Sequence, residues 1–177
     1  MVKSLYIVSV LILSMSCSAF QSQYSRTEEQ FDVSSYNPLI AGINETIDFN
    51  KITARHIKHA TEVVLVEGDN ILDAILTVPD SLWTFENTIL PLDNLYNTVS
   101  KVWNPIELLA SVSGNEAIRI ACDEKSLMFI EYFIELSSNE SLYTAVMSFA
   151  QTNEAKTLPK HLKRFLDSEL RDFRHSG

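Results

Sequence analysis

Apolar residues recur at helical spacing along most of this chain, and the clearest case lies near its centre, between residues 83 and 103. There the apolar side chains follow one another at intervals of three and four residues. This spacing places them on one side of an α-helix over about four turns. The stretch therefore predicts a central helix whose apolar stripe is covered by its neighbours. The residues that form the stripe are Ile89, Leu92, Tyr96, Val99 and Trp103.

The residues around this stripe predict where the central helix begins and ends. Thr84 is the expected N-cap, because its hydroxyl can accept a hydrogen bond from the first turn, and Glu86 adds a favourable negative charge there. Pro91 falls early enough to remove few hydrogen bonds. The Asn104–Pro105 step predicts an interruption, after which a kinked continuation runs to about Val112.

Four more segments have the same helical period. They cover about 54–78 with Thr53 as N-cap, 116–136 after a turn at 113–115, 142–149, and a last helix that starts at 157–159. Gly68 is expected to bend or loosen the first of them. We predict an all-α fold, an antiparallel bundle of about five long helices. The expected inward positions are Ile57, Val64, Ile71, Ile75, Val78, Ile118, Cys122, Phe129, Phe133, Leu136, Leu142, Ala145, Val146, Phe149, Leu162, Phe165, Leu166, Glu169, Leu170 and Phe173.

The first residues have a different pattern, which is typical of an export signal. Lys3 precedes an apolar run of about eleven residues, 5–15, which is too short to span a bilayer. We predict a signal over residues 1–19, a polar flexible spacer over 20–36, and the helical domain over 37–177. The protein is then exported, secreted or periplasmic, without a stable transmembrane span. Two alternatives stay open, namely a lipid anchor on Cys17 and a retained N-terminal anchor.

Composition narrows the classes of partner. The net charge of −9 and the pI near 4.8 argue against nucleic acid as a partner, because duplex binding requires clustered Lys and Arg.

The chain has two cysteines, so no disulfide framework is expected in the domain. Cys122 lies on an apolar stripe and is interpreted as a small buried residue rather than a nucleophile. Asn44 and Asn139 stand in sequons that would matter only in a eukaryotic secretory pathway.

Residues suited to metal binding or catalysis are few. A zinc peptidase helix needs His-Glu-x-x-His, and no histidine of this chain is followed by glutamate. His56, His59 and Glu62 could share a helix face, but a further ligand is missing, so we interpret them as a solvated face. The Ser111–Gly114 segment lacks the glycine pattern of a serine nucleophile. We therefore predict no catalytic, cofactor-binding or metal-ligating residue in this chain.

Other groups of similar residues have simpler explanations than a site. The paired carboxylates Asp123–Glu124 and Glu28–Glu29 are adjacent rather than convergent, and we interpret them as solubilising charge. The basic run 160–164 is expected on the solvent-exposed face of the last helix. Aromatic residues at helical spacing are expected in the core rather than in a ligand-binding box. They are Trp83, Trp103, Phe129, Tyr132 and Phe133.

Several short stretches, read in order, carry a resemblance. They are Asn37-Pro38-Leu39, Phe49-Asn50-Lys51-Ile52 with His56 after it, Trp83-Thr84-Phe85-Glu86-Asn87-Thr88 with Pro91-Leu92, Trp103-Asn104-Pro105, Asn139-Glu140-Ser141-Leu142-Tyr143, and the closing residues 170–177. Together they resemble the N-terminal region of the M3 family of zinc metallopeptidases, the group of oligopeptidase A, thimet oligopeptidase and dipeptidyl carboxypeptidase. The oligopeptidase A pattern is the most similar.

The resemblance implies a role without chemistry of its own. In this family the N-terminal helices form part of the wall of a deep channel, and the zinc-binding His-Glu-x-x-His helix lies far downstream. We therefore expect a non-catalytic wall, truncated before the catalytic domain, with zinc only in a full-length relative. The expected partners are the missing catalytic domain or a partner chain, and short peptides, which the family cleaves. The helix that leads to Gly177, a residue typical of a helix end, supports the truncation.

Two alternatives remain. One is a standalone exported helical module that binds peptides or proteins without catalysis, and the other is an enzyme that uses residues not recognised here. Exposed surface separates the wall from the standalone module. A wall without its partner should expose a large apolar patch, whereas a self-sufficient module should not.

Overall fold

The fold is described from a computed structural model, which defines residues 36–40, 42, 45–80 and 82–176. The predictions for the export signal, the lipid anchor at Cys17, the spacer up to residue 35, the Glu28–Glu29 pair and Asn44 concern residues outside these ranges. Within them the regular structure is helical and contains no strand, which confirms the predicted all-α fold. None of the helices in these ranges is both long enough and apolar enough to cross a membrane.

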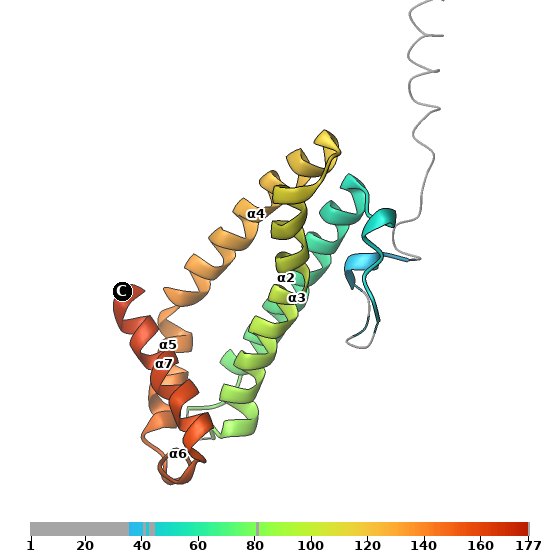
Figure 1. Cartoon of the computed structure of the whole chain (residues 1–177). Coiled ribbons are helices and arrows are strands. Elements are labelled where there is room, and N and C mark those ends of the chain that lie inside the picture. The colour runs from blue at the N-terminus through green and yellow to red at the C-terminus, as the bar shows by residue number, and fades with distance from the viewer. Residues whose placement is uncertain (1–35, 41, 43–44, 81, 177) are drawn as a thin grey trace, which may run out of the picture. The chain divides into compact units, whose positions relative to one another are not determined.

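In the described part of the chain, the fold consists of five long helices and one short one (Figure 1). α2 and α3 lie side by side, α4 returns along them from the connection at 113–115, and α5, α6 and α7 gather at the other end. The helices are α2 (Ala54–Leu76), α3 (Leu90–Val112), α4 (Glu116–Ser137), α5 (Glu140–Ala150), α6 (Asn153–Thr157) and α7 (Lys160–Ser176). Three short helical turns precede or join them, η1 (Pro38–Ile40), η2 (Phe49–Lys51) and η3 (Phe85–Ile89).

The central helix begins as its sequence predicts. Thr84 Oγ1 accepts a hydrogen bond from the Asn87 N–H at 3.2 Å, and Asn87 Oδ1 accepts one from the Thr84 N–H at 2.7 Å. The next turn, η3, is a π-turn in which the Leu90 N–H bonds to the Phe85 carbonyl. Pro91 follows at once, in the first turn of α3. The wide turn accommodates the proline, which has no N–H to donate and whose ring would crowd a normal helical carbonyl.

The predicted interruption at Asn104–Pro105 is absent, because α3 continues through Pro105 to Val112. The predicted end at Val112 is confirmed. Pro105 removes one N–H from the helical ladder. Burial of Val102, Ile106 and Leu109 on either side of it, at 3%, 0% and 6% exposure, offsets that loss and keeps the helix intact.

Gly68 lies inside α2 and allows close packing rather than a break. A Cβ at this position would lie 2.5 Å from Oη of Tyr132 on α4 and 3.2 Å from Cγ2 of Val99 on α3. The helix is continuous through Gly68 and ends at Leu76, before the predicted Val78. Glycine is therefore needed where three helices meet, because a larger side chain would overlap the tyrosine.

The core follows the predicted stripes. Of the predicted inward residues, most are buried, whereas Ile71, Val78, Ile118, Phe133, Leu162 and Phe165 are half-buried. Cys122 has no exposed surface, and its burial raises the pKa of the thiol to about 11, as expected for a structural cysteine.

The helix α6 was not predicted. Thr152 caps it by accepting a hydrogen bond from the Ala155 N–H at 3.1 Å.

Candidate interaction surface

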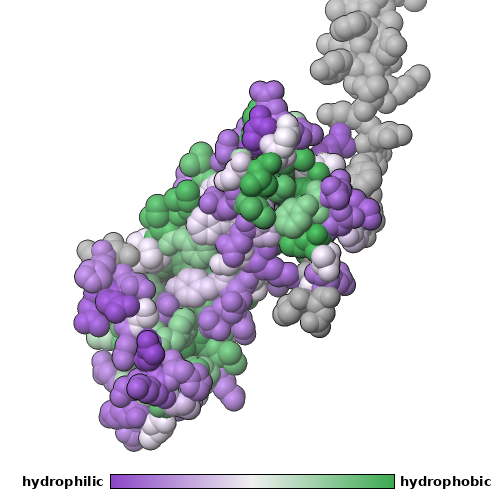
Figure 2. Space-filling view, in the orientation of Figure 1, coloured by the Kyte–Doolittle hydropathy of each residue, from purple (hydrophilic) through white to green (hydrophobic). Residues whose placement is uncertain are grey.

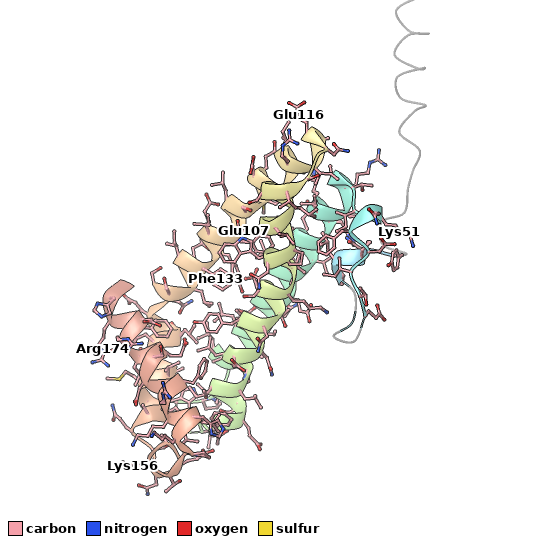
Figure 3. The ribbon with its side chains drawn as sticks, viewed as in Figure 1. Lys51, Glu107, Glu116, Phe133, Lys156 and Arg174 are labelled. Atoms are coloured by element: carbon pink, nitrogen blue, oxygen red, sulfur yellow. The ribbon has the colours of Figure 1, made fainter. Side chains whose placement is uncertain are left out.

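An aromatic cluster fixes the inner face of α4 against α3. The ring of Trp103 stacks on Phe129 and Phe133, with centroid separations of 5.8 and 5.2 Å. Tyr96 stacks on Phe133 at 6.1 Å, and Tyr132 meets Phe133 edge-on at 5.9 Å. Figure 3 shows Phe133 projecting from α4 toward α3. These residues pack as predicted, and they leave the opposite face of α4 uncovered by α3.

That opposite face is also apolar. Ile120, Leu127, Ile130 and Ile134 follow one another at spacings of seven, three and four residues, and we call them the outer stripe of α4. Their exposed fractions are 51%, 61%, 43% and 60%. Figure 2 shows hydrophobic side chains gathered along the edge of the molecule where α4 runs. Apolar side chains in line on a helix are normally buried, so this stripe has the character of a surface that another element covers.

The exposed charges of α4 have one sign. Every exposed charged residue of α4 is acidic. The two basic residues of the helix are half-buried and bond close to their own positions. Arg119 Nη1 donates to the Ser113 carbonyl at 2.8 Å, and Lys125 Nζ donates to the Met128 sulfur at 3.3 Å. The exposed acidic residues are Glu116, Asp123, Glu124, Glu131 and Glu135.

A groove lies on another part of the molecule, where Leu39, Ile40, Gly42, Glu45 and Ile47 face α2 and α3. Its volume is about 660 Å³. Apolar side chains such as Ile47, Val63 and Val102 line it, and Glu67 and Lys101 add charges of both signs. A cavity of this size and mixed character is suited to a short peptide or a small ligand.

The interpretation of His56 as part of a solvated face is wrong. Its side chain is 2% exposed, and Nδ1 accepts a hydrogen bond from the Thr53 N–H at 3.2 Å. Thr53 Oγ1 in turn accepts from the His56 N–H at 3.4 Å, so the two residues close the start of α2. Burial lowers the pKa of His56, and a backbone hydrogen bond to Lys51 opposes this effect. The Thr-x-x-His spacing, equivalent to a capping box, was the available signal.

The other candidate ligands do not converge. His59 is half-buried, with Nδ1 3.2 Å from Asn37 Nδ2, while Glu62 is exposed. In the parts of the chain that the structure describes, no three His, Cys, Asp or Glu side chains come together as a metal site would require. Asp123 and Glu124 are both exposed, in agreement with their interpretation as solubilising charge.

Asn139 has a structural role that its sequon does not reveal. Its side chain caps α5 by accepting a hydrogen bond from the Leu142 N–H at 2.9 Å. The cap fixes the turn between α4 and α5, because it satisfies one of the free N–H groups at the start of the helix.

Comparison with known proteins gives one consistent result. The family model described as the N-terminal domain of neurolysin and thimet oligopeptidase matches residues 71–177. The chain is 28% identical to oligopeptidase A of Haemophilus influenzae over 145 residues, which cover 82% of this chain and 21% of that protein. It is 26% identical to oligopeptidase A of Escherichia coli over 141 residues, 80% of this chain and 20% of that protein. The chain thus spans about a fifth of the length of the relatives that it matches.

Proposed function

The chain belongs to the neurolysin/thimet oligopeptidase family through its N-terminal domain, and from this premise we propose that it is the non-catalytic helical wall of an exported oligopeptidase. The peptide-cleaving site then lies on a different segment or on a partner chain. Cleavage of short peptides is the activity of the assembled peptidase, and this chain contributes packing and shape.

One observation carries the proposal. The alignment with oligopeptidase A of Haemophilus influenzae covers 82% of this chain but 21% of the relative, and the matching family model describes an N-terminal domain. The outer stripe of α4 supports it, because apolar side chains exposed by 51% and 61% at Ile120 and Leu127 are typical of a surface that packs against something else.

The described residues do not fit the zinc ion that the family uses. The sequence contains no His-Glu-x-x-His, and His56, the first histidine of the candidate group, is buried in the N-terminal cap of α2. His59 lies beside Asn37. The rings of His56 and His59 therefore pack against residues near the start of α2. We therefore assign zinc to the catalytic part of the peptidase and derive no step through it in this chain.

Export belongs to the same proposal. The Lys3 charge and the apolar run 5–15 favour passage through a membrane by a cleavable signal.

Peptide-pool digestion tests the non-catalytic assignment directly. The full chain is incubated with a mixed pool of short peptides, with and without added zinc, and its metal content is measured. We expect intact peptides and no stoichiometric zinc.

Zinc-dependent cleavage that a chelator stops would contradict the assignment. The variants His56→Ala and His59→Ala would then identify the ligands, and Cys122→Ala, which removes a fully buried thiol from α4, is the control. Cleavage that persists in both histidine variants would come from other residues of the chain or from another protein in the preparation.

A second candidate function, an exported module that binds peptides without cleaving them, is favoured by the groove of about 660 Å³ beside α2 and α3. Equilibrium dialysis against the same peptide pool tests it. Retention of peptides that Val63→Trp abolishes would support this function, because a large side chain there fills the groove. Equal retention by the two proteins would exclude the groove as the binding site.

A further inference from the structure

The outer stripe of α4 has features that specify what covers it. We propose that it docks an amphipathic helix whose apolar seam is bordered by Lys and Arg side chains. This inference deepens the proposed function and rests on it for the expectation that the chain works beside a second protein segment. The chemistry of that segment follows from the spacing and the charges of α4.

The spacing favours a helix as the occupant. Ile120, Leu127 and Ile134 are separated by seven residues each, and Ile130 lies beside them on the same face. A seven-residue repeat is the period with which two α-helices pack along a shared seam. From Ile120 to Ile134 the stripe extends about 21 Å, at 1.5 Å per residue. A partner helix of four turns or more covers it fully.

The inner face of α4 is already occupied, which makes the outer stripe a second contact surface. Cys122, Phe129 and Leu136 are 0%, 0% and 3% exposed and face the core. The outer residues face away from this side, since an offset of one or two positions turns them by about 100° or 200° around the helix axis. Covering the stripe therefore requires an element beyond those that pack on the inner face.

The charges exclude a second copy of this chain as the favoured occupant. If two α4 helices paired antiparallel with Leu127 against Leu127, Asp123 of one copy would face Glu131 of the other. In a parallel pair, each acidic residue would meet its own equivalent. Like charges across a helical seam are destabilising. Asp123 lies in the seam itself, seven residues before Ile130, and Glu124 and Glu131 lie beside it. Lys or Arg at the flanks of a partner would pair with Glu124 and Glu131.

Binding of designed peptides to the full chain tests the proposal. The probe is a labelled helical peptide of about 20 residues with Leu at the seam and Lys at the flanks, and its counterpart has Glu at the flanks. Fluorescence anisotropy measures the affinity of each. We expect the Lys peptide to bind at least about tenfold more tightly than the Glu peptide.

A matched pair of variants shows where the peptide binds. Leu127→Asp should weaken binding of the Lys peptide at least about tenfold, although it adds a negative charge, because it interrupts the apolar seam. The control is Val66→Asp on α2, which adds the same charge at a side chain 59% exposed, close to the 61% of Leu127. That control should bind as the wild type does.

Charge reversal gives a second, independent readout. The double variant Glu124→Lys with Glu131→Lys should reverse the preference in favour of the Glu peptide. Reversing two exposed acidic residues elsewhere, Glu107→Lys on α3 with Asp167→Lys on α7, should leave the preference for the Lys peptide unchanged.

Three results would overturn the proposal. The first is equal affinity for the two peptides, and the second is binding that Leu127→Asp does not weaken. The third is a homodimer, detected by light scattering, that Leu127→Asp dissociates, because the stripe would then belong to a second copy. None of these results bears on whether the chain cleaves peptides. Conversely, zinc-dependent cleavage would contradict the proposed function without changing the binding result.

Discussion

The phenol of Tyr96 on α3 donates a hydrogen bond of 2.8 Å to Oε2 of Glu169 on α7, two residues that lie 73 positions apart. Glu169 is 8% exposed, and this burial raises the pKa of its carboxyl group. The negative charges of Asp172 and Asp93 raise the pKa further, by a smaller amount. The hydrogen bond from Tyr96 acts in the opposite direction. Burial also raises the pKa of Tyr96, so its phenol stays protonated and remains a donor. This pair joins the central helix to the last helix.

Removal of the Tyr96 hydroxyl should destabilise the fold. Tyr96→Phe keeps the ring stacked on Phe133 but leaves the buried carboxylate of Glu169 without this donor. We expect the free energy of unfolding to fall by about 1 to 3 kcal/mol in urea titrations at neutral pH. A loss no larger than that of the control Tyr143→Phe, whose ring packs on Phe173, would mean that the hydrogen bond contributes nothing.

The titration of Glu169 should make stability fall as pH rises. Because its pKa is raised in the folded protein above the ordinary value of 4.5, the folded state binds the proton more tightly than the unfolded chain does. Its stabilising contribution is therefore full at pH below 4.5 and is lost as pH rises through the folded pKa. Glu169→Gln should remove this dependence, so that its stability relative to wild type increases from acid to neutral pH.

Urea titrations across this pH range check the sign of that effect. Glu107→Gln, a substitution on the exposed side of α3, supplies the baseline of the pH dependence. A stability of Glu169→Gln that decreases relative to wild type toward neutral pH would show that the folded protein favours the charged carboxylate instead.

Gly68 should resist substitution even by alanine. Alanine is favoured over glycine in a helix by about 1 kcal/mol, but its Cβ would lie 2.5 Å from Tyr132 Oη. We expect Gly68→Ala to lower the free energy of unfolding by about 1 to 2 kcal/mol through overpacking. A stabilised variant would show that the tyrosine moves aside at no cost.

The hydroxyl of Tyr132 should account for this effect. It is buried and has no hydrogen-bond partner among the described residues, and burial raises its pKa to about 12. Tyr132→Phe alone should therefore not lower stability and should raise it by up to about 1 kcal/mol. Combined with Gly68→Ala, it should recover part of the loss, and a double-mutant cycle measures that recovery. If the stability changes of Gly68→Ala and Tyr132→Phe simply add, the new methyl group does not overlap the Tyr132 hydroxyl.

Trp103 should be the most costly aromatic residue to remove. Its ring is in contact with both Phe129 and Phe133, so truncation leaves a cavity between α3 and α4. We expect Trp103→Ala to cost about 3 to 5 kcal/mol and Trp103→Phe distinctly less, because a smaller ring keeps part of the stacking. If the free energy of unfolding of the alanine variant falls by less than about 1 kcal/mol, the side of the central helix that carries Trp103 does not face the core as assigned.

The sequence predicted the helices well because their apolar periods are regular. The stripe from Ile89 to Trp103 faces inward, and the caps at Thr53 and Thr84 lie where the pattern places them. Two local features were missed, one because packing outweighs propensity and one because the element is short. Pro105 remains inside α3 because its neighbours are deeply buried, and α6 is too short to show a period.

The surface was harder to predict than the core. Apolar residues occur on both faces of α4, and the period alone identified only the stripe with Cys122 and Phe129. A second stripe reduces the contrast between the faces that a pattern search needs. His56 was assigned to solvent although Thr53 was the expected N-cap, because the usual partner at the third helical position of a capping box is Glu or Gln rather than His.

A domain exchange measures most directly whether this chain is the wall of an oligopeptidase. Residues 36–177 replace the aligned segment of oligopeptidase A from Haemophilus influenzae, and the zinc-dependent kcat/KM of the hybrid is measured on a short peptide. A hybrid with the corresponding segment of the Escherichia coli protein is the control. We predict cleavage by both hybrids, within about tenfold of each other. An inactive hybrid beside an active control would contradict the account.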